Sequence, residues 1–420
     1  MPLRPKDTKK TQQVQNNFES KVLYLRNFAV IYFSSFLLKI QRNQKRLLFF
    51  LVLIPFFTFP QDAKFDSVAA IGIKQIYNIQ FNDAEKTFRS LISDYPRHPA
   101  GRFFLAMIDW WKILLDVDNE SYDDIFYQKL EDVIFHCDEI LKKDEKNVDA
   151  LFFKGGAIGF RGRLRALRES WLKAADDGRQ ALPIVERAAK LNPTNQDVQL
   201  GFGIYNYYAS VIPDKYPLVK PLMIFFPAGD KLKGIEQLKN TAFNGKYAKY
   251  EAQYFLMTLY FQYENDAIEA DTYAKMLTAQ FPDNPNFERW NGRIAVRKGE
   301  GTRYHKIFSE VLEKCNRNKN GYNKVVEREA AYYVGLFYKS INASDSSILY
   351  FEKSLNISVE IDKDETSGFQ INTVLYLGMM HDALNHREKA LEYYNQVLDL
   401  REYGSSRDLA RQYLKSAFKN

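Results

Sequence analysis

The residues best suited to chemistry in this 420-residue sequence are arginines and aromatic side chains gathered in two stretches. In the first, residues 153–171, four glycines within eight residues are followed by Arg161, Arg165 and Arg168 on one helical face. A guanidinium can grip a carboxylate or a phosphate through paired hydrogen bonds. The row therefore indicates an anion-binding patch or, alternatively, internal ion pairs with carboxylates such as Asp177. The candidate binding residues of this stretch are Arg161, Arg163, Arg165, Arg168 and Trp171.

The second stretch, residues 205–230, is rich in aromatic residues and carries four prolines. Because each proline lacks a backbone donor and clashes with the preceding turn, they forbid a continuous helix. We expect an ordered insertion between the two helices of one hairpin, which either fills the protein's own concave channel or forms a wall of a ligand groove. Its candidate binding residues are Tyr205, Tyr208, Tyr216 and Phe226. On neighbouring hairpins the two stretches would meet, and arginine beside aromatic surface is enriched at binding hot spots.

Signatures of catalysis and metal binding are absent from the sequence. It contains no nucleophile elbow, no glycine loop that cradles phosphate, and no helix with paired metal-binding histidines. His381 and His386 lie across a helix–loop boundary and are expected at the surface. Cys137 and Cys315 are expected to be buried as small hydrophobic residues. We therefore predict no enzyme activity, no cofactor and no metal.

The net charge of +7 is concentrated in residues 1–46, where ten Lys and Arg oppose Asp7 and Glu19. The remaining sequence is nearly neutral. It therefore lacks the basic surface on which binding to a phosphate backbone depends, and we expect no nucleic-acid partner. A composition of 46% hydrophobic and 26% charged residues is typical of a folded chain.

Residues 41–64 follow the plan of a secretory signal peptide. A basic stretch precedes an apolar run at 47–60, which is shorter than the roughly twenty residues of a membrane-spanning helix and contains Pro55. We expect cleavage near Pro60 and Gln61 and export to the periplasm or cell envelope, although Phe59 and Pro60 depart from the small-residue rule of cleavage sites. The basic extension of residues 1–46 indicates either a start assigned too far upstream or membrane association through this segment.

Helical periodicity dominates residues 61–420, and short breakers divide this region into helix pairs. A small residue in the first helix is followed twelve positions later by another, at Gly72 and Ala84, Gly335 and Ser347, and Gly378 and Ala390. Antiparallel helices approach closely only where neither carries a bulky side chain. The pattern predicts hairpins at about residues 65–96, 97–145, 146–193, 196–245, 247–284, 285–322, 325–362 and 367–403, and a polar capping helix at 405–418.

This spacing resembles the tetratricopeptide repeat, which has a small residue in its first helix, an alanine and an aromatic residue in its second, and a terminal proline. Gly378, Ala390 and Tyr394 match it best. Gly-Phe-Arg-Gly-Arg-Leu-Arg at 159–165 and Tyr-Asn-Tyr-Tyr at 205–208 also look like an uncharacterised family of bacterial envelope-associated tetratricopeptide proteins. The resemblance covers about residues 60–415. It implies export and an all-α, right-handed superhelical solenoid of antiparallel helix hairpins, and no known reaction.

Three functions remain open at this point. Stacked hairpins create an extended curved surface, which favours a scaffold that binds a protein or peptide in its concave groove. The alternative is an envelope protein that binds a small ligand or glycan in a pocket closed by the aromatic insertion. An unrecognised enzyme is the lesser alternative.

Overall fold

The computed structural model describes residues 60–215, 227–363 and 365–419. The chain divides into two units, residues 1–63 and residues 64–420, and the second holds nearly all the described helices. The predicted basic extension and, apart from Pro60, the apolar segment lie outside the described residues, as do Tyr216 and Phe226. Within the described ranges every regular element is a helix. None of the helices described there has the length and apolar character needed to cross a bilayer.

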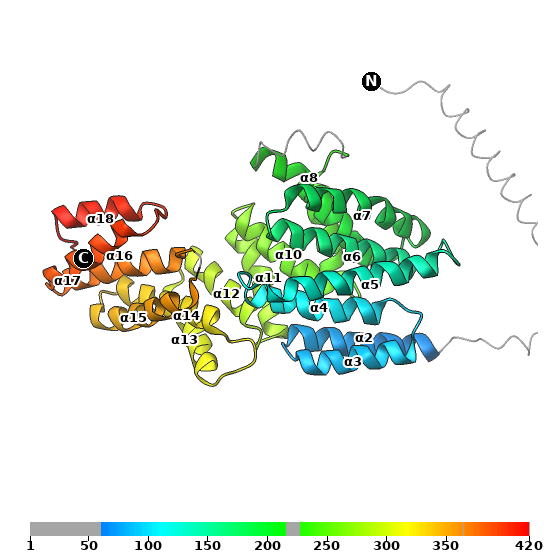
Figure 1. Cartoon of the computed structure of the whole chain (residues 1–420), viewed down its shortest axis with the longest axis horizontal. Helices are drawn as coiled ribbons and strands as arrows, with labels where there is room; N and C mark the ends of the chain where they lie inside the picture. Colours follow the sequence, from blue (N-terminus) through cyan, green and yellow to red (C-terminus); the bar gives the residue numbers. More distant parts are fainter. Residues whose placement is uncertain (1–59, 216–226, 364, 420) are drawn as a thin grey trace, which may run out of the picture. The chain divides into compact units, whose positions relative to one another are not determined.

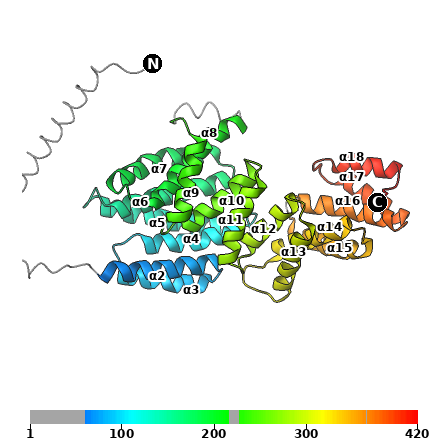
Figure 2. The same cartoon turned by 180° about the vertical axis from the view of Figure 1, so that it is seen from behind.

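Eight helix pairs follow one another along the described chain, and a final helix covers the last pair (Figures 1 and 2). In each pair, "first helix" and "second helix" here mean the earlier and the later one in the sequence. The pairs are α2 (Pro60–Tyr77) with α3 (Phe81–Asp94), α4 (Ala100–Leu115) with α5 (Asp123–Leu141), α6 (Val148–Leu167) with α7 (Trp171–Leu191), α8 (Gln199–Lys215) with α9 (Lys231–Asn244), α10 (Lys249–Gln262) with α11 (Ala267–Gln280), α12 (Pro285–Arg297) with α13 (Gly301–Asn316), α14 (Lys324–Ser340) with α15 (Ser344–Ile361), and α16 (Gly368–Ala383) with α17 (Arg387–Asp399); α18 (Ser406–Lys415) is last. The predicted all-α class and the eight hairpins are confirmed.

Local turn chemistry sets the ends of these helices. In most pairs, the turn between the two helices contains one residue with a left-handed backbone, which Gly and Asn adopt at least cost. These residues are Ile79, Glu169, Asn265, Gly299, Asn342 and Asn385. At the start of several first helices, a side-chain oxygen accepts a hydrogen bond from an otherwise unpaired backbone N–H, at Asn147, Asn284, Asn323 and Ser367. These caps explain why the sequence breakers predicted the pair boundaries well.

The two helices of a pair meet where the first carries a glycine. A Cβ atom added to Gly378 would lie 2.6 Å from the Tyr394 ring, and one added to Gly335 would lie 2.7 Å from Phe351. Each of these rings follows the predicted small residue of the second helix by one helical turn. The hydroxyl of one such residue, Ser347, also donates a 3.0 Å hydrogen bond to the Gly335 carbonyl. The small-residue pattern is therefore the contact that closes the hairpins in which the first helix carries such a glycine.

The first five pairs wind tightly enough for their first helices to enclose α10. This helix is buried on nearly all sides. At the end of α2, the Tyr77 ring packs 5.2 Å from Tyr250 of α10, 5.3 Å from Phe281 and 4.9 Å from Trp111 of α4, measured between ring centroids. The Asn284 amide donates a 2.9 Å hydrogen bond to the Tyr77 carbonyl, 207 residues away in sequence. One hydrophobic core consequently runs from α2 to α12.

The last three pairs continue from α12 without enclosing another helix (Figures 1 and 2). Separate hydrophobic clusters hold α13 with α14 and α14 with α16 to α18. The Arg387 guanidinium donates hydrogen bonds to the carbonyls of Tyr413 and Leu414 at 2.7 and 2.9 Å, and thereby fastens α18 to the last pair. These bonds confirm the predicted capping helix.

Two local expectations were wrong. Helix α8 continues through Pro213 to Lys215, so the insertion does not begin at residue 205. Pro213 has no N–H to donate to the carbonyl four residues earlier, but α8 ends two residues later, so the proline affects only the last turn of the helix. His381 is not at the surface but 4% exposed, with its ring stacked 5.5 Å from that of Tyr393.

Candidate functional site

Helix α6 carries the predicted arginine row, and its glycines set how close the row lies to α7. A Cβ atom on Gly155 would lie 2.6 Å from Val185 of α7, and one on Gly162 would lie 3.0 Å from Asp177. By contrast, a Cβ atom on Gly159 would meet nothing within 4 Å. Two of the four glycines are therefore required by the close approach of α6 and α7.

Arg161 and Arg165 share one fully buried carboxylate. The Arg161 guanidinium donates to Asp177 Oδ1 at 2.6 Å, and that of Arg165 donates to Oδ2 at 2.7 Å. Arg161 also forms a 2.5 Å ion pair with Glu131 of α5. Asp177 is the partner that the sequence offered as the internal alternative to a ligand. Because a buried carboxylate without its cation is unfavourable, removal of both guanidinium groups would destabilise the α6–α7 hairpin.

Arg168 ends the row at the connection between α4 and α5. Its guanidinium donates to Asp123 Oδ2 at 2.6 Å and to the Val117 carbonyl at 2.6 Å. Asp123 is the first residue of α5, so the three arginines of the row contact carboxylates of α5 and α7.

Arg163 points the other way, into the enclosed core. Its guanidinium donates to Glu251 of α10 at 2.5 Å and lies 4.8 Å from the Trp110 ring and 5.4 Å from the Phe255 ring. Burial and the Glu251 carboxylate together raise the pKa of Tyr77 well above its ordinary value, because the Tyr77 hydroxyl donates to Glu251 at 3.4 Å. Arg163 is thus a bridge between α6, α10 and, through Glu251, α2.

The predicted aromatic residues that the structure describes likewise differ in position, since one faces the enclosed core and the others lie outside it. Tyr208 packs 5.5 Å from Phe255, the ring that Arg163 also covers, and burial raises the Tyr208 pKa. Tyr205 donates a 2.6 Å hydrogen bond to the Pro227 carbonyl. Trp171 begins α7 and is 48% exposed. The structure therefore brings Arg163 together with Tyr208 through Phe255, while Arg161, Arg165 and Arg168 pair elsewhere.

Sequence reasoning missed a second arginine row, on α12. Arg289, Arg293 and Arg297 recur at every fourth position, which places them along one helix face. Glu329 of α14 accepts hydrogen bonds from Arg289 and Arg293, each at 2.6 Å. The spacing was visible in the sequence, but nothing there distinguished it from an ordinary solvated face.

Among the described residues, no cluster of three or more His, Cys, Asp or Glu side chains has the geometry to hold a metal ion. Cys137 and Cys315 are buried free thiols, and burial raises the pKa of each to about 12. Neither thiol is therefore a nucleophile near neutral pH.

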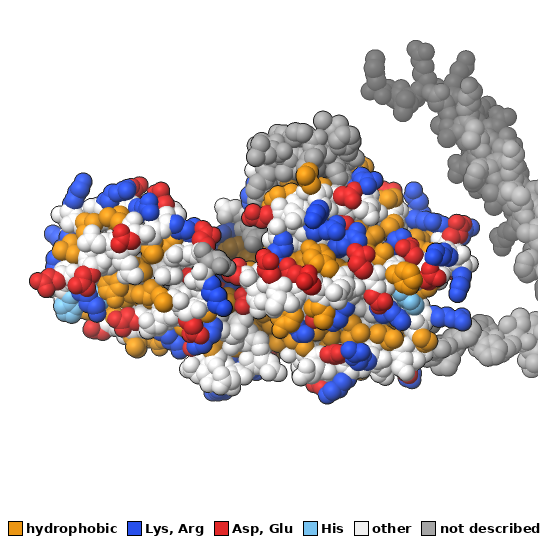
Figure 3. Space-filling model, viewed as in Figure 1, with side chains coloured by type: hydrophobic (Ala, Val, Ile, Leu, Met, Phe, Trp, Pro, Cys, Tyr) orange, Lys and Arg blue, Asp and Glu red, His pale blue; other side chains and the backbone are white. Residues whose placement is uncertain are grey.

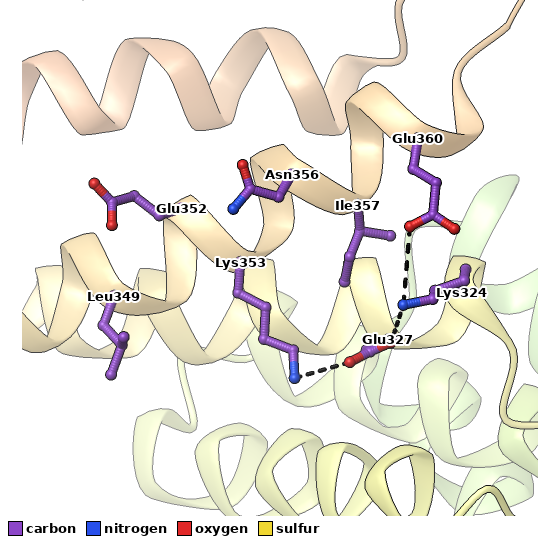
Figure 4. A pocket seen from close by; sticks show the side chains of 8 residues that line it. All are labelled: Lys324, Glu327, Leu349, Glu352, Lys353, Asn356, Ile357 and Glu360. Atoms are coloured by element: carbon purple, nitrogen blue, oxygen red, sulfur yellow. Dashed lines mark ion pairs between the residues drawn. The ribbon is translucent and has the colours of Figure 1, made fainter.

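An open depression lies between the start of α14 and the length of α15 (Figure 4). Its charged side chains largely pair with one another: Lys353 lies 2.8 Å from Glu327, and Lys324 lies 3.4 Å from Glu327 and 3.9 Å from Glu360. Exposed ion pairs of this kind contribute about 0–1 kcal/mol to stability. Each charged side chain that lines the depression has an ion-pair partner, so none is left unpaired to orient a ligand.

No protein-family model and no curated protein matches this sequence. Among solved structures, the C-terminal part of a TPR repeat-containing protein from Cytophaga hutchinsonii aligns with 73% of this chain and 98% of its own, at 14% identity and a TM-score of 0.34. The human IFIT1 dimer with m7Gppp-AAAA aligns over 85% of this chain and 88% of its own, at 10% identity and a TM-score of 0.39. The Cut9 and Hcn1 hetero-tetramer of APC/C aligns over 80% and 73%, at 12% identity and a TM-score of 0.39.

The helix pairs of this chain establish its architecture without those alignments. Eight consecutive pairs, a glycine-to-ring contact inside the pair in several of them, and a last helix over the open end are the features of a tetratricopeptide-like stack. The described part of the chain is therefore an all-α helical-repeat solenoid of the tetratricopeptide-like type.

Proposed function

We propose that this chain is a non-catalytic, exported scaffold that binds a protein or peptide partner on the faces of its first helices. A stack of helix pairs presents one face of each first helix, and adjacent faces combine into a surface suited to peptides and helices. The observation that carries the proposal is that α12, α14 and α16 keep aromatic and cationic side chains exposed or partly exposed on such faces. Arg297 is exposed, and Tyr333, Lys339 and Tyr376 are partly exposed.

The arginine row of α6 contributes at its edge. Arg165 keeps a quarter of its side chain exposed while it pairs with Asp177. Trp171, six residues further along the chain at the start of α7, adds exposed aromatic surface. A partner can contact this edge without displacing the internal ion pairs, so we retain Arg161, Arg165, Arg168 and Trp171 as binding residues of the proposal.

Export is part of the proposal. It rests on residues 41–64, in which a basic segment is followed by an apolar segment and then by a polar one. Mass spectrometry of the native protein's N-terminus tests it. We expect a mature chain that begins near Gln61. Abundant peptides from residues 23–36 in the mature protein would contradict cleavage.

Co-purification of the tagged full-length chain from detergent-solubilised cell envelopes tests the scaffold function. We expect a stoichiometric protein partner. Arg165→Ala should weaken its capture without lowering the melting temperature by more than a few degrees, because the Arg161–Asp177 pair remains. A retained small molecule and no protein would instead support the ligand-binding alternative and contradict the scaffold.

A further inference from the structure

The faces of the first helices differ between the two ends of the stack. In residues 64–284 they are buried against one another around α10, as at Trp111, Tyr254 and Phe255, which are 2%, 8% and 5% exposed. Most residues of α12 and α16 are buried as well, but Arg297 is exposed and Arg293, Tyr333, Lys339 and Tyr376 are partly exposed. Figure 3 shows the surface notched between these two ends. The residues Arg293, Arg297, Tyr333, Lys339 and Tyr376 are named the open face below. These side chains are the part of the surface of α12, α14 and α16 that a partner can contact.

Cationic side chains on the open face outnumber the carboxylates that pair with them. Glu329 pairs with Arg289 and Arg293, and although its burial opposes ionisation, these two guanidinium groups hold its pKa at about 2. The single carboxylate thus neutralises one of the two arginines. Among the described residues, no carboxylate oxygen forms an ion pair with Arg297 or with Lys339 within 4.0 Å. A surplus of positive charge therefore lies along α12 and the end of α14.

The unpaired cations rest on aromatic rings instead. The Arg297 guanidinium lies 3.5 Å from the centroid of Phe261 and donates to the Phe261 carbonyl. Lys339 Nζ lies 5.3 Å from the Tyr376 ring and 5.5 Å from that of Phe418, and burial lowers the Lys339 pKa. Cation–ring contacts stabilise by only about 0.5–2 kcal/mol, which leaves the charge available to an arriving anion. Aromatic rings beside the cations add apolar surface that would be covered by the same occupant.

We infer that the open face binds an acidic segment of a protein partner, whose carboxylates pair with Arg297 and Lys339 while its apolar side chains cover Tyr333 and Tyr376. This inference rests on the proposed scaffold function and specifies the chemical character of the partner segment that the scaffold binds. Charge complementarity selects this occupant, since a basic segment would meet like charge and an uncharged one would leave the cations unpaired. Electrostatic complementarity of this kind sets partner choice and the rate of association.

Fluorescence anisotropy with a labelled peptide in which Glu alternates with Leu tests the inference on the purified full-length chain. The double variant Arg297→Glu, Lys339→Glu should weaken binding by about tenfold or more. Lys86→Glu with Lys306→Glu is the matched control, because it makes the same charge change at exposed positions of the second helices α3 and α13. The variant Arg297→Gln, Lys339→Gln removes charge without adding repulsion, and circular dichroism melts verify folding of each variant.

A loss confined to the open-face variants, with the control pair within about twofold of the native chain, supports the inference. Equal losses in both pairs would show a general electrostatic effect and overturn it, as would tighter binding of a single-stranded RNA of equal charge. A peptide in which Gln replaces Glu should bind poorly, and equal binding of it would also contradict the inference. If the tagged open-face variant still co-purifies with the native partner, the inference fails while the scaffold function stands. If the native chain captures no protein, the scaffold function itself fails.

Discussion

The two ends of this molecule are built from the same kind of helix pair, but they differ in how far the faces of the first helices are exposed. From α2 to α11 the first helices turn their faces inward around α10, and the ring of Tyr77 meets α4 and α10 together. From α12 to α18 the pairs stack in sequence, and the equivalent faces carry Arg297 and Lys339. The internal contact of the pair is common to both ends. The difference teaches that the side chains on the first-helix face, rather than the pair itself, decide whether a stack closes on itself or stays open.

The largest expected effect comes from removing a ring that closes the first region. Tyr77→Ala deletes a side chain that is 5% exposed and packs against Trp111, Tyr250 and Phe281. We expect the free energy of unfolding to fall by about 3–5 kcal/mol. Tyr376→Ala, on the open face, should cost less than about 2 kcal/mol. Denaturant melts measure both, and equal costs would remove the distinction between the two regions.

A smaller effect should be shared by the two regions. Gly72→Ala and Gly378→Ala each place a methyl group against the ring of the second helix, Phe88 and Tyr394 respectively. We expect each change to lower the free energy of unfolding by about 1–3 kcal/mol through overpacking. Thermal melts of the two variants test this. A large cost at one glycine and none at the other would show that the hairpin contact is not a common unit.

The smallest expected effect is a pH dependence confined to the last hairpin. Burial, with lesser contributions from Lys389 and His386, lowers the His381 pKa from 6.5 to about 4, and neither ring nitrogen has a hydrogen-bond partner. The folded chain therefore keeps this imidazole neutral, while the unfolded chain takes up a proton below about pH 6.5. Stability contributed by the neutral ring is complete above that pH and is lost as pH falls toward 4. The loss at about pH 5 should be on the order of 1–2 kcal/mol.

Urea melts of the native chain and of His381→Phe between about pH 5 and 7.5 measure this dependence. The variant should lose the acid-linked part of the destabilisation, because phenylalanine fills the same stacked position on Tyr393 without a titrating group. His386→Gln, at an exposed position, is the matched control and should leave the dependence in place. An unchanged pH profile in His381→Phe would contradict the role assigned to the buried imidazole.

Local features of the fold were predictable because local contacts create them. Gly378, Ala390 and Tyr394 lie within one hairpin, so their spacing along the chain already encodes the contact that packs it. The caps at Asn284 and Ser367 likewise act over two or three residues. The extent of α8 was not predicted, because we expected the prolines of residues 205–230 to exclude a helix from the whole stretch. Pro213 removes one backbone donor, two residues before α8 ends at Lys215.

The enclosure of α10 was not predicted, because it depends on contacts between residues far apart in the chain. Tyr77 meets Glu251 and Phe281 only after four pairs have wound around. One signal was available: residues 250–261 are apolar or aromatic on almost every helical face, which is typical of a helix buried all round. The arginine row of α6 was placed correctly on one face, and Asp177 was correctly offered as an internal partner. The turn of Arg163 into the core was missed, since its partner Glu251 lies 88 residues away.

A zero-length crosslink between α2 and the start of α10 tests the central claim most directly. Lys246 Nζ lies 2.5 Å from Asp66 Oδ1, and the neighbouring Tyr247 donates to the same carboxylate across 181 residues of sequence. Carbodiimide treatment of the monomer, followed by peptide mass spectrometry, should join Lys246 to Asp66. It should also join Lys154 to Asp138, a 2.5 Å pair between adjacent hairpins that any stack would contain. Recovery of both crosslinks is the predicted result. Recovery of Lys154–Asp138 alone would show that the first five pairs form an open stack and would contradict the account.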